Sequence, residues 1–172
     1  SWAKVQPRLA RSKDEDVRRI TRELSLVFGD GRAMAELRQI AKSSDDLDGR
    51  RSAIRTLVAA RDKTIVPVLQ SLLGDRELAV DAIRGLAAFD DPTTPKRIID
   101  HYDAHRREPA RQESIATLTS RPDFAKELMA AVETGKIAPS QVTPFQLRQL
   151  QLLGNARINH DIDRLWPELK QL

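Results

Sequence analysis

The stretch IRGLAAFDD, residues 83–91, decides the fold because it joins a helix signal to a turn signal. Ile83 and Leu86 stand three positions apart, which places both side chains on one face of a helix. Asp91 follows Leu86 by five positions. A carboxylate placed after a turn accepts hydrogen bonds from the unpaired N–H groups that begin the next helix. The stretch therefore predicts a helix, a tight turn and a second, capped helix.

The same register recurs along the chain. Its copies share a buried-type leucine and, five positions later, an acid or amide: Leu57 with Asp62, Leu86 with Asp91, Leu118 with Asp123, and Leu150 with Asn155. A looser copy has Leu24 before Gly29-Asp30, and the five leucines are separated by 33, 29, 32 and 32 residues. Helix pairs at this period bury their apolar faces only by stacking on one another. The sequence predicts an all-α fold, a right-handed α-α solenoid of about five degenerate helix pairs.

Ten helices follow from this register. Their expected bounds are 14–28 with 31–42, 47–60 with 64–73, 76–88 with 92–104, 109–119 with 122–134, and 144–153 with 156–170. Thr143 and Gln146 form a capping-box pattern, and 135–143 is the longest irregular connection. We expect residues 1–13 to be a basic arm or the remnant of a preceding repeat, and residues 14–172 to be a single repeat domain.

Composition limits the chemistry available to this chain. There is no cysteine, which excludes disulfides, thiolate zinc sites, iron–sulfur clusters and covalent haem attachment within it. No apolar run approaches the ~18 residues needed to span a bilayer. The formal net charge of +4 resides in the arm, which carries Lys4, Arg8, Arg11 and Lys13 and no acid, whereas residues 14–172 hold 25 basic and 25 acidic residues. A phosphate-binding face needs a concentrated basic surplus, so nucleic acid is not the expected partner.

The period and the helix–turn–helix register resemble HEAT repeats, a large group of solenoid binding modules. A narrower resemblance rests on four segments in order: IRGLAAFDDPTTP from Ile83, LTSRP from Leu118, PFQLRQL from Pro144, and Leu165-Trp166. Together they look like the helical repeat region of large exported multidomain proteins from planctomycetes and their relatives. In that family this region lies between a sugar-dehydrogenase-like β-propeller and a c-type cytochrome domain.

That resemblance implies an extracytoplasmic, periplasmic parent with redox chemistry, in which this segment is a spacer or docking module. Position 1 is Ser, so we expect the chain to be a piece of a longer protein. Neither the propeller nor a Cys-x-x-Cys-His motif is present, so no haem-binding or catalytic residue transfers to this chain, and no cofactor is expected in it. The sequence itself does not fix a localisation.

Several polar residues invite a functional interpretation. His101 and His105 stand four apart on an expected helix, a spacing that suits a metal such as zinc, but no third ligand is evident. The structural alternative is that both histidines lie on a solvated face near the end of a helix, where a histidine side chain is electrostatically favourable. Arg55, Arg84 and Arg148 share one slot of the repeat and suit an anion or an acidic partner. Pairing with a nearby carboxylate is the simpler interpretation.

The remaining candidates fit structural roles better. Asp62, Asp91 and Asp123 lack a partner base and are explained as caps, and Ser114 and Ser120 lack a nucleophile motif. Trp2 and Trp166 stand at opposite ends of the chain, so a base-stacking groove is not expected, and Trp166 is expected to seal the last pair.

These observations favour a non-catalytic protein-interaction or spacer module whose partner is protein, in the first place flanking domains of the same polypeptide. The expected interaction surface is the exposed side of the second helices, at Arg97, His101, Lys126 and Arg164. Two alternatives stay open: a nucleic-acid-binding repeat protein that uses the basic arm, and a metal-binding protein or enzyme that uses His101 and His105.

Overall fold

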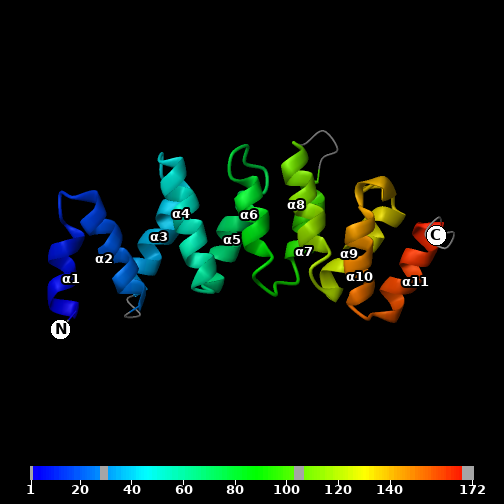
Figure 1. Ribbon diagram of the computed structural model, residues 1–172. Coiled ribbons are helices and arrows are strands. Elements are labelled where there is room, and N and C mark those ends of the chain that lie inside the picture. Colours follow the sequence, from blue (N-terminus) through cyan, green and yellow to red (C-terminus); the bar gives the residue numbers. More distant parts are fainter. Residues whose placement is uncertain (1, 28–30, 103–106, 168–172) are drawn as a thin grey trace. The chain divides into compact units, whose positions relative to one another are not determined.

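The computed structural model describes residues 2–27, 31–102 and 107–167. Every regular element in these ranges is helical, with eleven α-helices and two short 3₁₀ helices (Figure 1). The predicted all-α class is therefore confirmed. None of the described helices is both long enough and apolar enough to cross a membrane.

The chain divides into two compact units, residues 1–65 and 66–172. The first unit contains α1 (Trp2–Ala10), α2 (Glu15–Val27), α3 (Gly31–Ser43), α4 (Leu47–Ala59) and the 3₁₀ helix η1 (Lys63–Ile65). The second contains α5 (Val66–Ser71), α6 (Ala79–Leu86), α7 (Thr94–Asp100), α8 (Glu108–Leu118), α9 (Pro122–Glu133), the 3₁₀ helix η2 (Pro139–Gln141), α10 (Pro144–Leu152) and α11 (Ala156–Leu165).

All ten helices expected from the repeat register are present, with ends that differ by a few residues. The helix expected over 64–73 is split into η1 and the short α5, and the helix expected over 92–104 is described only as Thr94–Asp100. Residues 2–10 of the expected arm form α1, which packs against α2. Gly135 (φ +74°) and Gly154 (φ +65°) end α9 and α10 in the left-handed conformation that glycine favours.

In the first unit, each helix packs against its neighbour in the chain: α1 on α2, α2 on α3, and α3 on α4. Ile54 and Leu57 of α4 are buried, as the register predicts. The expectation for Leu24 is wrong, because this side chain is 39% exposed. Helix α2 instead buries Thr21 and Ser25, and the Thr21 hydroxyl donates to the Val17 carbonyl at 2.6 Å. A hydroxyl satisfied within its own helix can be buried at little cost, which accounts for Thr21, whereas the buried Ser25 hydroxyl has no partner among the described residues.

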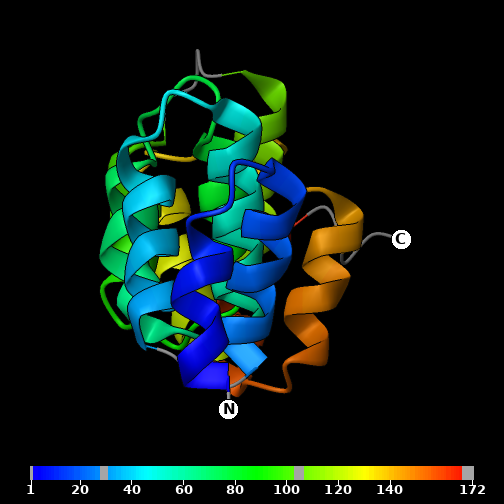
Figure 2. The ribbon, with the colours of Figure 1, turned by 90° about the vertical axis from the view of Figure 1, so that its left-hand side faces the viewer.

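In the second unit, helices two apart in the chain also lie side by side. Helix α6 packs against α8, α7 packs against both α5 and α9, and α9 packs against α11. In Figure 2, α9 (yellow) and α10 (orange) lie on opposite sides of this unit. The register leucines Leu86, Leu118 and Leu150 are all fully buried. Trp166 closes the core after α11, and its indole N–H donates to the Pro139 carbonyl at 3.1 Å.

The register leucines provide a direct test of this core. Leu86→Ala is expected to lower the free energy of unfolding by roughly 2–5 kcal/mol, because it leaves a cavity in a fully buried site. Leu152→Ala, in the same unit, is the matched control, because Leu152 is 85% exposed. Denaturant titration followed by circular dichroism measures both variants, and equal losses would contradict the assignment.

Candidate functional site

The four residues expected to form the interaction surface are all exposed. Arg97 and His101 lie at the end of α7, Lys126 on α9 and Arg164 on α11. Since α7 packs against α9 and α9 against α11, these helices present the four side chains from adjacent elements. Their use as a binding surface stays a prediction.

Ion pairs occupy much of this surface. Arg164 bridges α11 to α9 through Glu133 at 2.7 Å and also pairs with Asp161 at 3.2 Å, and these hydrogen bonds raise the pKa of Arg164. Lys126 pairs with Asp123 at 2.8 Å. The result is a polar face of mixed charge, on which Arg164 and Lys126 are partly neutralised by acids of α9 and α11.

The proposed histidine pair is described only in part. His101 is exposed at the end of α7, and its Nδ1 lies 2.9 Å from the Arg97 carbonyl oxygen. His105 lies outside the described residues. Within residues 2–27, 31–102 and 107–167, no group of three or more His, Asp or Glu side chains is placed to hold a metal ion.

The turn carboxylates form a more definite arrangement. The Asp62 carboxylate accepts from the Thr64 backbone N–H at 3.0 Å and from the Thr64 hydroxyl at 2.6 Å, at the start of η1. It also accepts from Arg38 of α3 at 2.7 Å. Asp62 is therefore a cap, as predicted, and it also joins its turn to the helix of the preceding pair.

Asp91 repeats this arrangement in the second unit. Its carboxylate accepts from the backbone N–H groups of Thr93 at 2.9 Å and Thr94 at 3.1 Å, at the start of α7. The donor from the preceding pair is here Gln70 of α5, whose amide reaches Asp91 at 3.4 Å and Thr93 at 3.0 Å. Two independent copies of one register thus hold the same carboxylate in the same way.

Hydrogen bonding dominates the electrostatics of both turns. Burial favours a higher pKa at Asp62, but hydrogen bonds from Thr64 and Arg38 outweigh it and lower the pKa below its ordinary value. At Asp91 the same opposition between burial and hydrogen bonds, from Thr93 and Thr94, also lowers the pKa. Both carboxylates are thereby stabilised in the charged form that accepts these hydrogen bonds.

The other two expected caps have different outcomes. Asn155 caps α11, accepting from the N–H groups of Arg157 at 3.1 Å and Ile158 at 3.2 Å. The expectation for Asp123 is wrong. Pro122 is the first residue of α9, so Asp123 lies inside the first turn, and the residue before the helix is Arg121.

Arg121 performs a linking role that the sequence interpretation missed. Its guanidinium stacks on the Phe124 ring at 4.8 Å from the centroid, pairs with Asp90 at 3.5 Å and donates to the Ala87 carbonyl. It therefore ties the turn before α9 to the turn after α6. The available signal is the spacing Arg-Pro-x-Phe, which places an aromatic ring one helical turn after the arginine.

Of the three arginines that share one position of the repeat, one forms the expected ion pair with a nearby carboxylate. Arg84 binds Glu113 of α8 through two hydrogen bonds, at 2.8 and 3.3 Å, which raise the pKa of Arg84. Within the described residues, no carboxylate pairs with Arg55 or Arg148, and both side chains are exposed. The pairing interpretation is therefore correct for Arg84 alone.

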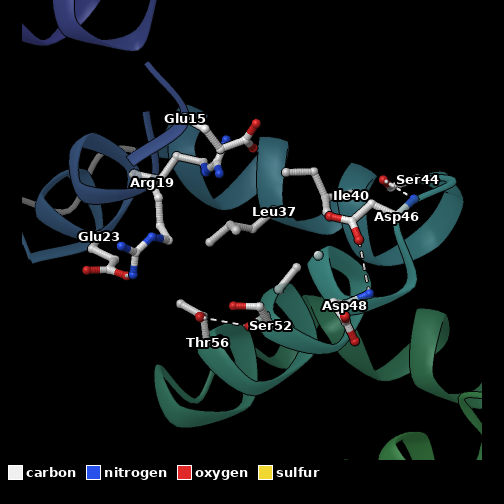
Figure 3. Close-up of a pocket in the computed structure, with 13 residues that line it drawn as sticks. Glu15, Arg19, Glu23, Leu37, Ile40, Ser44, Asp46, Asp48, Ser52 and Thr56 are labelled. Atoms are coloured by element: carbon white, nitrogen blue, oxygen red, sulfur yellow. Dashed lines mark hydrogen bonds and ion pairs between the residues drawn. The ribbon is translucent and has the colours of Figure 1, made fainter. Parts of the chain in front are cut away.

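A groove of about 480 Å³ lies in the first unit between α2 and α4 (Figure 3). Leu37 and Ile40 of α3 form its floor, and Arg19 of α2 and Asp48 of α4 lie on its walls. Arg19 already pairs with Asp16 at 3.0 Å. The groove thus combines an apolar floor with charged walls of both signs, and no single ligand chemistry is favoured.

Two adjacent cavities lie beside α8 in the second unit. One, of about 580 Å³, is polar and contains the Arg84–Glu113 pair. The other, of about 490 Å³, lies between α8 and α10 and is lined by Phe145 and Leu152. They share Ala116 of α8, together with Thr143 and Gln146 at the start of α10.

The pH dependence of stability tests the capping carboxylates. Because its folded pKa is lowered, Asp91 stabilises the fold above its ordinary pKa, and this contribution is lost as pH falls below about 4. Asp91→Asn should cost about 1 kcal/mol at neutral pH and make the stability curve shallower below about pH 5. Urea titrations across that range measure this change, and an unaltered slope would contradict it. Asp123→Asn is the control, with an expected change within about 0.5 kcal/mol at neutral pH.

Comparison with protein-family models, with curated proteins and with solved structures finds no match to this chain.

Proposed function

We propose that this chain is a non-catalytic protein-interaction or spacer module in which HEAT-like helix pairs stack as a right-handed solenoid. The observation that carries the proposal is the repeated turn. Asp62 and Asp91 each cap the second helix of a pair while accepting from the preceding pair, through Arg38 and Gln70 respectively. A link from each pair to the next is what a stacked repeat requires, because a single pair cannot bury its apolar faces.

The hydrogen bonds made by the serine hydroxyls and the capping carboxylates support a role without catalysis. The Ser114 hydroxyl donates to the Ala110 carbonyl at 2.8 Å, and the Ser120 hydroxyl donates to the Thr117 carbonyl at 2.7 Å. The capping carboxylates are held in their charged form by several donors. Groups occupied in this way stabilise helices and turns, and a nucleophile or general base needs a different environment.

The proposed context is a larger extracytoplasmic redox protein, on the strength of the sequence resemblance. In that context the partners are flanking domains of the same polypeptide, and this segment holds them apart or docks one of them. The proposed contact surface comprises Arg97, His101, Lys126 and Arg164. Its mixed, partly paired charges suit the polar rim of an interface, where charge sets orientation and association rate more than affinity.

The flanking gene sequence provides the first test. A Cys-x-x-Cys-His motif within the next hundred or so residues is expected, since haem attachment needs that motif. The neighbouring domain can then be titrated against this chain by calorimetry. Arg97→Glu combined with Lys126→Glu should weaken binding several-fold, and Arg76→Glu, on a side chain that is 79% exposed, is the control. Equal affinities for wild type and the double variant would contradict the proposed surface.

One observation favours nucleic acid as a second candidate. Residues 1–65 hold 15 basic and 10 acidic residues, and Lys4, Arg8, Arg11 and Lys13 are all exposed on α1 and the segment after it. A surplus at one end of the chain attracts phosphates, and the attraction weakens steeply with salt.

Changing these four residues to glutamine tests that candidate while keeping α1 in place. If phosphates are the ligand, wild type should bind labelled duplex with an affinity that falls with salt, and the quadruple variant should lose most of that binding. Arg76→Glu serves again as control. Absence of binding by wild type at low salt would remove the candidate.

A further inference from the structure

Helix α10 exposes two large apolar side chains on one face. Phe145 is 63% exposed and Leu152 is 85% exposed. They are seven residues apart, close to two helical turns, so they lie in line along the helix, about 10 Å from each other. Leu147 and Leu150 of the same helix are buried, so α10 packs into the core without the exposed pair.

The exposed pair borders the 490 Å³ cavity between α8 and α10, which we call the α10 groove. Ala116 and Thr119 form its α8 side, and Gln149 lies between Phe145 and Leu152 on its α10 side. Single exposed apolar residues are ordinary, whereas contiguous exposed apolar surface marks interaction sites and ligand-binding grooves, and this aligned pair borders a groove. A stripe of this spacing matches the apolar positions that repeat every seven residues on an amphipathic helix.

The carboxylates near the α10 groove are paired with basic side chains, whereas an arginine beside the groove has no carboxylate partner among the described residues. The lining of the groove contains no carboxylate among the described residues. In the adjacent polar cavity, Glu113 is bound by Arg84 and Glu108 by Arg111. In the cavity that shares Ser120 with the α10 groove, Asp90 pairs with Arg121 and Asp123 with Lys126. Arg148 lies on the exposed face of α10, midway between Phe145 and Leu152, and no described carboxylate pairs with it.

We propose that the α10 groove docks an acidic amphipathic helix of a partner protein. Apolar side chains of that helix pack on Phe145 and Leu152, and a carboxylate beside them binds Arg148. The proposal rests on the proposed role as an interaction module and names a second face for it, outside the surface formed by Arg97, His101, Lys126 and Arg164.

The position of Arg148 disfavours a second copy of the chain as the occupant. In an antiparallel two-fold pairing of α10, Phe145 of one copy would meet Leu152 of the other. Arg148 is near the midpoint of that stripe, so the two Arg148 side chains would approach each other at the axis. Like charges brought together in this way destabilise a contact, whereas an acidic partner stabilises it.

A pair of synthetic peptides tests the proposal on the whole chain. One is a fluorescent helical peptide of about 18 residues with leucine at every third or fourth position and glutamate on its other faces, which makes an apolar stripe. The second has lysine in place of glutamate. Fluorescence anisotropy near physiological salt should show the glutamate peptide binding more tightly than the lysine peptide.

Three variants locate the binding. Phe145→Ser with Leu152→Ser should weaken glutamate-peptide binding by about tenfold or more, because the apolar anchors are lost. Arg148→Glu should weaken the glutamate peptide and strengthen the lysine peptide, each several-fold. Ile20→Ser, at an apolar residue that is 48% exposed on α2, should change neither. Arg148→Glu keeps the apolar pair intact, so its reversal of preference is independent of any loss of folding in the double variant.

Any one of three results would overturn the proposal. They are equal binding of the two peptides by wild type, glutamate-peptide binding unaffected by the double serine variant, and no reversal of peptide preference in Arg148→Glu. Dimerisation of wild type that the double serine variant abolishes in sedimentation would assign the groove to a second copy. If a flanking domain binds and responds to Arg97→Glu with Lys126→Glu while the peptides fail, the α10 groove is refuted and the interaction module stands.

Discussion

A turn carboxylate held from two directions is the interaction on which the helix pairs depend. At Asp62, the N–H and hydroxyl of Thr64 approach from the helix that follows, and Arg38 approaches from the preceding pair. A charged carboxylate has acceptor capacity for all of these donors at once. One side chain therefore sets where a helix begins and how the previous helix lies against it. Asp91 and Gln70 reproduce the arrangement with a neutral amide as the linking donor.

Where the carboxylate is missing, a different chemistry makes the link. Proline at 122 starts α9 two residues too early for Asp123 to cap it, and Arg121 stands at the helix boundary. Its guanidinium stacks on Phe124 and reaches the turn after α6. A cation held on an aromatic face and a carboxylate held by two donors are different interactions, but both join a turn to the preceding pair: Asp62 and Asp91 reach a helix of that pair, and Arg121 reaches its turn. The constraint is therefore the link between consecutive pairs, and the residue type that provides it can vary.

This distinction explains how much the sequence could predict. The five-residue spacing from leucine to acid or amide located the turns, and the capping residues Asp62, Asp91 and Asn155 followed from local geometry. Leu24 was misjudged because a three-residue period identifies an apolar face without saying whether a neighbour covers it. The linking donors Arg38 and Gln70 lie more than twenty residues from their acceptors, so no local pattern reveals them. The expected surface at Arg97 and Lys126 is exposed, but exposure alone does not assign it a ligand.

The α10 groove could not be predicted from the sequence, because it too depends on contacts between residues far apart in the chain. It is lined in part by Thr143, at the end of the connection over 135–143 that the sequence left irregular. There, Gln141 accepts from the Tyr102 hydroxyl at 2.9 Å, and the Pro139 carbonyl accepts from Trp166 at 3.1 Å. These contacts anchor η2 to residues that follow α7 and α11. Phe145 and Leu152 fit a helix pattern equally well whether covered or not, and the sequence could not distinguish the two cases.

The two candidate faces of this chain differ in what they can contribute to binding. Arg164 is already paired with Glu133 of α9 and Asp161 of its own helix, and Lys126 is paired with Asp123 of its own helix, so a partner must compete with existing ion pairs. Exchanging one exposed ion pair for another contributes little to affinity. Phe145 and Leu152 are exposed to water, and covering them removes apolar surface from water, which is the usual source of affinity at an interface. A charged face that orients a neighbouring domain and an apolar groove that binds a helix are complementary functions. A module with both of the proposed faces would hold one partner in place while it engages another.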